Sequence, residues 1–311
     1  MFANAIEKVS MFTRPVKFIM RNFGSKDIIP GTATLFFINE NGVAITCKHV
    51  TDELLKCSPI NQKYEKYKTE INALPVKGDS ITVSIAKKYG YTDGVTLQYK
   101  SMFFDCVETD DNSISFNIVA HPKYDLSIIR MQGIKSIRYS GHAIFAKDST
   151  ILRRGDFLCR YGYPFSEFSD YEYDATIDEI RWTNSGKIGT PAFPIEGMYT
   201  RNVVDADANI YEYELSTPGL RGQSGGPLFD ANGIVFGMQS ETTFFHLGFD
   251  QDNARVRIGG HIREVENHPF LHVGRCITVD VIKDFLDKNK IKYYIGDSTG
   301  LVETVNGEAD E

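Results

Sequence analysis

Apolar and β-branched residues occur in short runs through the middle of the chain, separated by turn residues. The runs at 32–38 and 43–46 flank Asn-Glu-Asn-Gly at 39–42, which predicts a β-hairpin. Residues 226–237 repeat this pattern around a second Asn-Gly turn. Further strands are predicted at 80–86, 113–119, 126–131, 157–162, 175–182 and 211–216. Short strands at this density predict an all-β barrel or sandwich rather than a parallel sheet.

Helical patterns are few. Residues 50–56 predict a short helix or turn after the first hairpin. Residues 280–288 place their apolar side chains on one face and predict a C-terminal helix. Residues 297–311 carry acidic side chains, no basic ones and few apolar ones, which predicts a flexible acidic tail.

The first 28 residues alternate phenylalanines with lysines and arginines. They predict an N-terminal arm whose aromatic side chains pack on the main body; a helix that binds a membrane or a partner is the alternative. No apolar run is long enough for a spanning helix, and the segment lacks the apolar core of a secretory signal. We therefore expect a cytoplasmic protein without membrane contact.

Charge and cysteine usage narrow the function further. The net charge of −7 argues against a nucleic-acid surface, which requires clustered basic residues. Five scattered cysteines are typical of free thiols and form no metal-ligand spacing. His246, His261, His268 and His272 also lack such spacing, and we interpret them as part of an elaborated loop. Neither a metal ion nor a cofactor is expected.

Ser224 lies in the string Gly-Gln-Ser-Gly-Gly-Pro at 222–227, the most informative sequence in the chain. The glycines leave the serine hydroxyl uncovered and the neighbouring backbone N–H groups accessible. Such a serine is typical of a nucleophile, and a nucleophilic serine needs a general base and a group that orients that base.

His49 and Asp125 are the candidates for these two roles. His49 follows the second strand of the first hairpin, and Asp125 precedes an apolar strand beside the core. Asp105, Asp110 and Asp111 are the alternatives for the carboxylate. Cys47 lies within the strand before His49 and is interpreted as a small buried apolar residue.

These residues also carry a family resemblance. Gly-Thr-Ala at 31–33, Thr-Cys-Lys-His-Val at 46–50, Asp-Leu-Ser-Ile-Ile at 125–129 and Gly-Gln-Ser-Gly-Gly-Pro-Leu at 222–228 occur in the order His, Asp, Ser. The chain thus resembles chymotrypsin-fold (trypsin-like) serine peptidases over about residues 29 to 290. The resemblance is closest to the bacterial, HtrA-like branch, although no PDZ domain is expected here.

The resemblance implies two antiparallel six-stranded β-barrels with a C-terminal helix. The first barrel would span residues 29–148, with His49 and Asp125, and the second residues 149–296, with Ser224. Ser224 would attack a peptide carbonyl, His49 would act as the base, and Asp125 would orient it. The N–H groups of Gly222 and Ser224 would form the oxyanion hole.

Two departures from the family pattern stand out. Gln223 replaces the Asp that pairs with a newly cut N-terminus in trypsin-like zymogens, so activation by terminal cleavage is not expected. The long interval between His49 and Asp125 implies an insertion, which we place within residues 52–77.

The same comparison assigns Pro218 to the base of the specificity pocket, Ser240 to its wall, and Arg221 and Gln239 beside it. It predicts a small or medium uncharged residue before the scissile bond of a protein or peptide substrate. A regulatory protein could bind the N-terminal arm or the loops. Two other functions remain open: a catalytically silent binding module with this fold, and a serine esterase of the α/β-hydrolase type.

Overall fold

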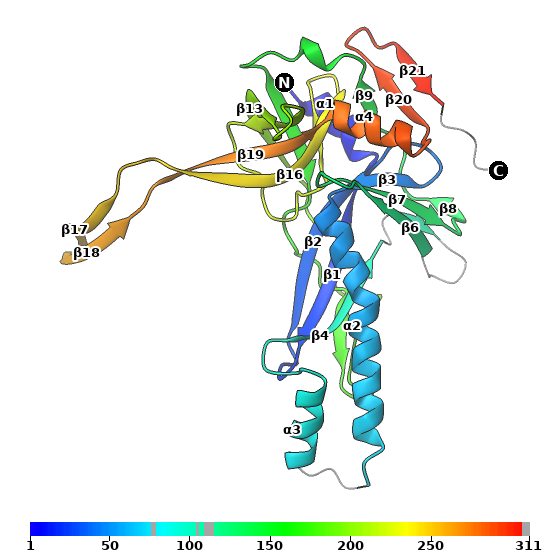
Figure 1. Ribbon diagram of the computed structural model, residues 1–311, viewed down its shortest axis with the longest axis vertical. Coiled ribbons are helices and arrows are strands. Elements are labelled where there is room, and N and C mark those ends of the chain that lie inside the picture. Colours follow the sequence, from blue (N-terminus) through cyan, green and yellow to red (C-terminus); the bar gives the residue numbers. More distant parts are fainter. Residues whose placement is uncertain (76–78, 104–105, 109–114, 307–311) are drawn as a thin grey trace.

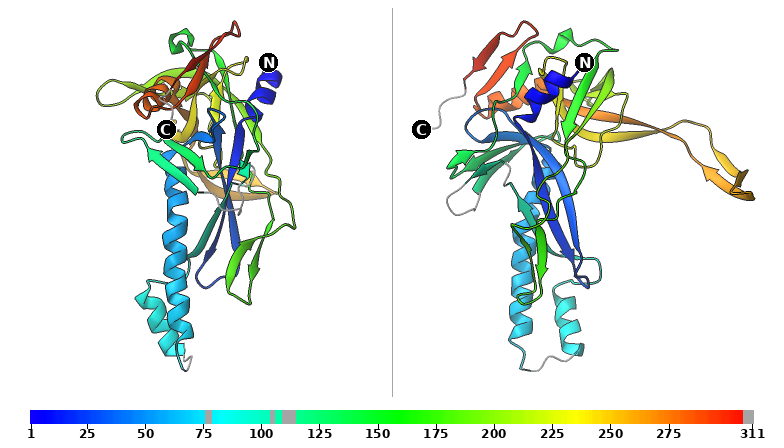
Figure 2. Two further views of the ribbon diagram at one scale, coloured as in Figure 1. Left: turned by 90° about the vertical axis from the view of Figure 1, so that its right-hand side faces the viewer. Right: turned by 180° about the vertical axis from the view of Figure 1, so that it is seen from behind.

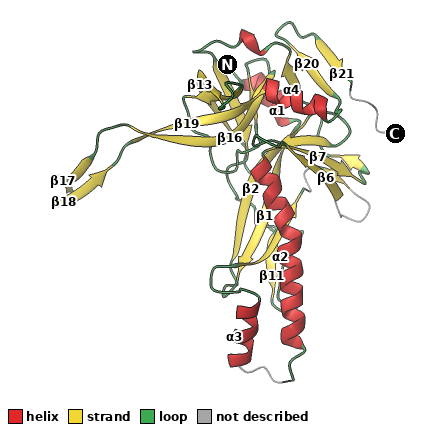
Figure 3. Cartoon of the chain, viewed as in Figure 1, coloured by secondary structure: helices red, strands yellow, loops and turns green. Residues whose placement is uncertain are grey.

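Two β-sheets form the body of the protein, and two long extensions leave it in different directions (Figures 1 and 2). The computed structural model describes residues 1–306 except 76–78, 104–105 and 109–114. One extension consists of helices, and the other is a two-stranded ribbon (Figure 3).

The first sheet has six antiparallel strands that curl into an open half-barrel. Its strands, in spatial order, are β4 (Thr96–Met102), β1 (Thr13–Asn22), β2 (Ile28–Phe37), β3 (Val43–Thr46), β7 (Ser127–Gln132) and β6 (Ser115–Ala120). Leu35, Phe36 and Phe37 at the end of β2 are fully buried. This burial on both faces explains why the sequence there is a continuous apolar run.

The second sheet contains a closed ring of six antiparallel strands, because β15 pairs with both β10 and β16. The ring runs through β15 (Pro227–Phe229), β10 (Phe157–Gly162), β13 (Phe193–Val204), β14 (Ile210–Leu215), β19 (Phe270–Thr278) and β16 (Val235–His246). Three strands extend the sheet beyond β16: β9 (Ile144–Ala146), β20 (Tyr293–Gly296) and β21 (Val302–Val305). The predicted chymotrypsin-like fold of two β-barrels with a C-terminal helix is therefore confirmed, and its first barrel is the open one.

The remaining strands form three small pairs. They are β5 (Val107–Glu108) with β8 (Ser136–Ile137), β11 (Tyr171–Asp174) with β12 (Glu179–Trp182), and β17 (Gln251–Ile258) with β18 (His261–Asn267). The last pair lies at the tip of the ribbon that β16 and β19 form beyond the ring (Figure 1).

Four α-helices accompany the sheets, together with the short 3-10 helix η1 (Ser149–Ile151). They are α1 (Ala3–Ser10), α2 (Lys48–Asn72), α3 (Asp79–Lys88) and α4 (Val279–Lys288). The Thr278 hydroxyl caps α4, whose buried Ile282, Phe285 and Leu286 dock it on the core. None of the described helices is long and apolar enough to cross a membrane.

Several sequence predictions were wrong in this part of the chain. Residues 80–86 form most of helix α3, not a strand, because the alternating Ile81 and Val83 are exposed and packing occurs through Ile85 and Ala86. Helix α2 extends far past the predicted 50–56, even though Pro59 lies inside it. Together α2 and α3 form the helical extension; α2 covers much of the predicted insertion at 52–77, and α3 lies beyond it.

The two chain ends also differ from their predictions. Within the predicted arm, residues 13–22 form β1, which pairs with β2 and β4 inside the first sheet. Helix α1 packs on the second barrel, where the Phe2 ring meets Phe229 edge-on. Within the predicted flexible tail, β21 pairs with β20, because its two valines and Thr304 favour a strand.

The buried core predicts a simple stability difference. Leu35 is 0% exposed and Leu55, on the surface of α2, is 57% exposed. Leu35→Ala should lower the free energy of unfolding by about 2–5 kcal/mol, since it leaves a cavity. Leu55→Ala should change it by less than about 0.5 kcal/mol. Urea unfolding measures both; equal losses would contradict the described packing.

Candidate active site

His49 and Asp125 come together because their strands are neighbours. Strand β3 ends at Thr46, and His49 follows in the first turn of α2. Asp125 lies just before β7, which pairs with β3 through Thr46 and Ser127. One carboxylate oxygen of Asp125 lies 2.8 Å from His49 Nδ1, and the other accepts the His49 backbone N–H at 3.0 Å. The two bonds fix both the ring and its backbone, so Nε2 is left to face outward.

Within this pair, each side chain stabilises the charged form of the other. The hydrogen bond to Asp125 raises the pKa of His49, against the lowering effect of partial burial. Burial alone would raise the pKa of Asp125, but the hydrogen bonds from His49 lower it overall. Asp125 therefore stays ionised at neutral pH and stabilises a protonated His49.

Ser224 lies in a loop whose glycines are required by close contacts. Gly225 has φ +86°, and a Cβ there would lie 2.1 Å from the Thr34 carbonyl oxygen and 2.2 Å from Thr46 Oγ1. Gly222 has φ +95°, and a Cβ there would lie 2.7 Å from the Tyr163 carbonyl oxygen. The glycine string thus allows the loop to pack directly on the strands that carry His49.

Thr34 of β2 joins this loop to the first sheet. Its N–H donates to the Ser224 carbonyl at 3.0 Å, and its hydroxyl donates to the Gly222 carbonyl at 2.8 Å. On the other side, the Cys47 thiol donates to the carbonyl of Gln239 at 3.2 Å. Cys47 is fully buried, and burial raises its pKa, as expected for an inert thiol.

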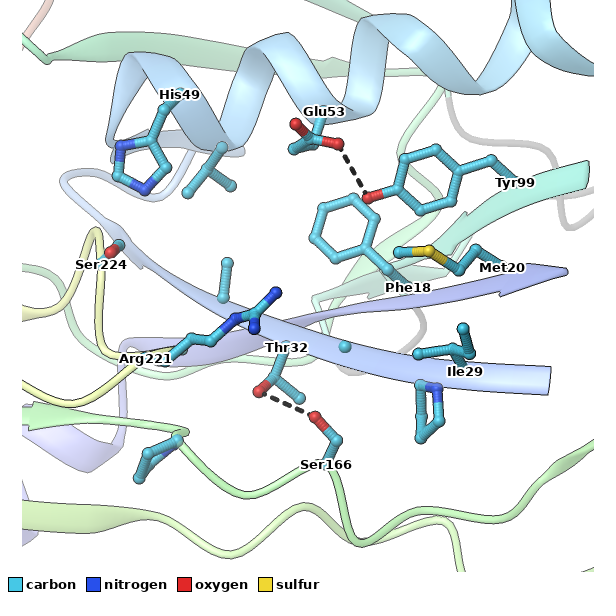
Figure 4. Close-up of a pocket in the computed structure, with 16 residues that line it drawn as sticks. Phe18, Met20, Ile29, Thr32, His49, Glu53, Tyr99, Ser166, Arg221 and Ser224 are labelled. Carbon is cyan, nitrogen blue, oxygen red and sulfur yellow. Dashed lines mark hydrogen bonds between the residues drawn. The ribbon is translucent and has the colours of Figure 1, made fainter. Parts of the chain in front are cut away.

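His49 and Ser224 line one pocket of about 560 Å³ between the barrels (Figure 4). Arg221 also faces this space, and Phe18, Met20 and Tyr99 form an apolar wall. The Ser224 hydroxyl donates to the carbonyl of Ser240 at 3.3 Å. Among the described residues, no hydrogen bond joins Ser224 to His49.

Two backbone N–H groups beside Ser224 have no acceptor among the described hydrogen bonds. Among the described hydrogen bonds, neither the Gly222 N–H nor the Ser224 N–H donates to an acceptor. The buried side chain of Gln223 holds the loop in place: it accepts the Leu220 N–H at 3.0 Å and donates to the Phe193 carbonyl at 2.7 Å. An uncharged amide thus anchors this loop.

The predicted pocket residues occupy different positions. Arg221 lines the pocket with Ser224, whereas Gln239 and Ser240 are buried and Pro218 does not line it. The Ser240 hydroxyl lies 3.0 Å from both Glu212 Oε1 and the Arg275 carbonyl. The alternatives Asp105, Asp110 and Asp111 lie outside the described residues.

Glu212 is a residue that sequence reasoning missed. Burial raises its pKa to about 7, with the charges of Glu241 and Asp125 adding to the effect and Ser240 and Arg275 opposing it. It lies within a strand predicted from its apolar neighbours. The sequence near Glu212 gives no sign of this role, because its hydrogen-bond partner Ser240 is distant in the chain.

Two histidines of the ribbon, His246 and His268, share one carboxylate, Asp250. His246 Nε2 and His268 Nδ1 lie 2.7 Å and 2.9 Å from the same Asp250 oxygen, on the exposed surface. Their ligand atoms are close enough to hold a metal ion, as are those of Cys47, His49 and Asp125. The group of Cys47, His49 and Asp125 is explained without a metal ion, because His49 is hydrogen-bonded to Asp125 and the Cys47 thiol is buried.

Comparison with known proteins identifies the family of this chain. Residues 31–238 match the trypsin-like peptidase domain family, which covers His49, Asp125 and Ser224. The chain belongs to this family. Among solved structures it is similar to the HtrA-type protease AlgW with a tripeptide, at 14% identity and a TM-score of 0.45. That alignment covers 91% of this chain and 62% of the other, so the chain spans less than two thirds of it. No curated protein matches the chain.

The two extensions lie differently with respect to the region that matches the family. The matched region includes helices α2 and α3, which lie between the histidine and the aspartate of this trypsin-like peptidase domain. Most of the ribbon lies beyond it, after residue 238.

The His49–Asp125 pair predicts a change in titration. In Asp125→Asn the pKa of His49 should fall, because the hydrogen bond to a carboxylate is its main cause of elevation. NMR titration of the imidazole measures this, with His142 as the unchanged reference. An unaltered His49 pKa would show that the pair is not formed in solution.

The raised pKa of His49 also makes the stability of the protein depend on pH. The folded-state pKa of His49 is raised, so its contribution to stability is fully present below the unfolded pKa. That contribution is lost as pH rises through the folded pKa. Asp125→Asn should therefore flatten this part of the stability profile, which denaturant melts at several pH values would record.

Proposed function

We propose that the protein is a serine endopeptidase that hydrolyses peptide bonds through His49, Asp125 and Ser224. Ser224 Oγ attacks the carbonyl carbon while His49 Nε2 takes its proton. The tetrahedral oxyanion accepts hydrogen bonds from the N–H groups of Gly222 and Ser224. His49 then protonates the leaving amine, and water releases the acyl group by the same steps. Asp125 keeps the imidazole oriented throughout.

The observation that carries this proposal is the doubly bonded His49–Asp125 pair in one pocket with a glycine-flanked Ser224. A rotation of the Ser224 side chain would release its hydroxyl from the Ser240 carbonyl, and in the proposed reaction that hydroxyl bonds to His49. Serine side chains make such rotations readily.

The bond from Ser224 to Ser240 also favours a second candidate, a catalytically silent binding module. In such a module Ser224 would keep its hydroxyl on the Ser240 carbonyl when a peptide binds. The esterase alternative required a strand–turn–helix around the serine. Here strands β15 and β16 follow Ser224, so the fold does not support that alternative.

Protein or peptide substrates are implied by the family. Regulation by a partner at the N-terminal arm or the loops stays a proposal. So does the cytoplasmic location, which the five cysteines support because all of them are free thiols.

Ser224→Ala tests the proposal directly. Wild type should react with a fluorophosphonate probe and cleave casein, and Ser224→Ala should lose labelling and lower the rate by roughly 10⁴–10⁶-fold. The matched control Ser58→Ala changes an exposed serine of α2 and should behave as wild type. Equal labelling of wild type and Ser224→Ala would contradict Ser224 as the nucleophile, and no labelling of either would favour the silent module.

A further inference from the structure

The ribbon that leaves the second barrel carries three metal-binding side chains close together, those of His246, Asp250 and His268 (Figure 1). Each offers one ligand atom, and the three atoms lie within 4.8 Å of one another. Two imidazole nitrogens and one carboxylate oxygen form a known type of zinc site, in which water takes the fourth position. The group takes no part in the proposed peptide hydrolysis.

The backbone holds the two histidines side by side, independently of the carboxylate. His246 pairs with Phe270 at the end of the ladder between β16 and β19. One residue further, the Leu247 N–H donates to the Pro269 carbonyl at 3.0 Å, and His268 is next to Pro269. The Phe270 ring meets the His246 imidazole edge-on, with 5.3 Å between the ring centroids. Both the positions of the histidines and the orientation of one ring are therefore restricted before any ion binds.

A turn at Gly248 brings Asp250 to the histidines. Gly248 has φ +80°, a backbone conformation that favours glycine. One Asp250 oxygen lies 2.7 Å from His246 Nε2 and 2.9 Å from His268 Nδ1, and the other oxygen has no partner among the described hydrogen bonds. Ligand atoms around a tetrahedral zinc ion are about 3.3 Å apart. Each N···O separation would thus lengthen by about half an ångström, which exposed side chains can accommodate.

The charges around this group favour a cation. Asp252 Oδ1 lies 3.9 Å from His268 Nε2, the ring nitrogen that does not contact Asp250. A histidine that binds a metal usually donates its other N–H to a carboxylate, and Asp252 is the described carboxylate that can take this role. Among the described ion pairs, no lysine or arginine contacts Asp250 or Asp252. The histidines are the partners of both carboxylates there.

His246 requires one rearrangement. A backbone N–H only donates, so His246 Nδ1 accepts the Gly248 N–H at 3.2 Å and Nε2 carries the proton directed at Asp250. Metal binding at Nε2 moves this proton to Nδ1, and the Gly248 N–H then bonds to water. The lost bond is at the long end of the normal range and lies on the exposed surface, so water replaces it at little cost.

We infer that His246, Asp250 and His268 bind one divalent transition-metal ion, for which zinc suits the ligand set, with water in the remaining position. The ligands come from both sides of the ribbon, so the ion would link the two chain segments where β16 and β19 give way to β17 and β18 (Figure 1). The inference does not depend on the proposed peptidase activity. It revises the expectation that these histidines hold no metal, which considered the histidine spacing without Asp250.

Calorimetric titration of the full chain with zinc chloride, after treatment with EDTA and dialysis, tests the inference. Wild type should bind one ion at this site, and His246→Ala and His268→Ala should each weaken that binding by roughly 100-fold or more, because two ligands remain. The matched control His261→Ala removes a ribbon histidine outside the group and should bind zinc as wild type does.

Three results of this titration would overturn the inference. They are no binding by wild type, binding that either His246→Ala or His268→Ala retains at full affinity, and an equal loss in His261→Ala.

Amide hydrogen exchange locates the ion independently. Zinc should slow exchange at residues 246–250 and 267–270 of wild type, and EDTA should reverse the effect. Asp250→Asn keeps an exposed polar side chain of the same size and should show neither change. Protection confined to residues 47–49 would assign the ion to the His49–Asp125 pair and contradict the ribbon site.

Discussion

The contact between the loop that carries Ser224 and strand β2 is the constraint on which the candidate active site depends. Thr34 binds the carbonyls of both Gly222 and Ser224, while Gly225 packs against the Thr34 carbonyl without room for a side chain. Each barrel contributes only part of the catalytic groups. Their relative position is therefore set by a few backbone contacts across this seam, and the glycines exist to allow them.

Two buried polar side chains of the second barrel, Gln223 and Arg160, contact the segments around Ser224. Gln223 holds the loop that carries Ser224 with two neutral hydrogen bonds, to the Leu220 N–H and the Phe193 carbonyl. The buried charge is instead on Arg160, which donates to Gln239 and to the Thr217 carbonyl.

The pairing of His49 with Asp125 and their shared neighbourhood with Ser224 could be predicted from the sequence, because each residue has a local signal. Ser224 is surrounded by glycines, and His49 and Asp125 border apolar strands. Arg160, Gln223 and Glu212 have no such signal, since their partners are distant in the chain and their own neighbours only indicate a strand or a loop. Helix α3 was missed because its β-branched residues alternate as in a strand, although the exposed face of a helix tolerates them.

A crystal structure of the protein with a peptidyl phosphonate bound to Ser224 tests the central claim most directly. The account predicts a covalent bond to Ser224 Oγ, His49 Nε2 within hydrogen-bond distance of that oxygen, and the phosphonyl oxygen between the N–H groups of Gly222 and Ser224. A His49 ring beyond hydrogen-bond reach of Ser224, or a phosphonyl oxygen pointing away from both N–H groups, would contradict it.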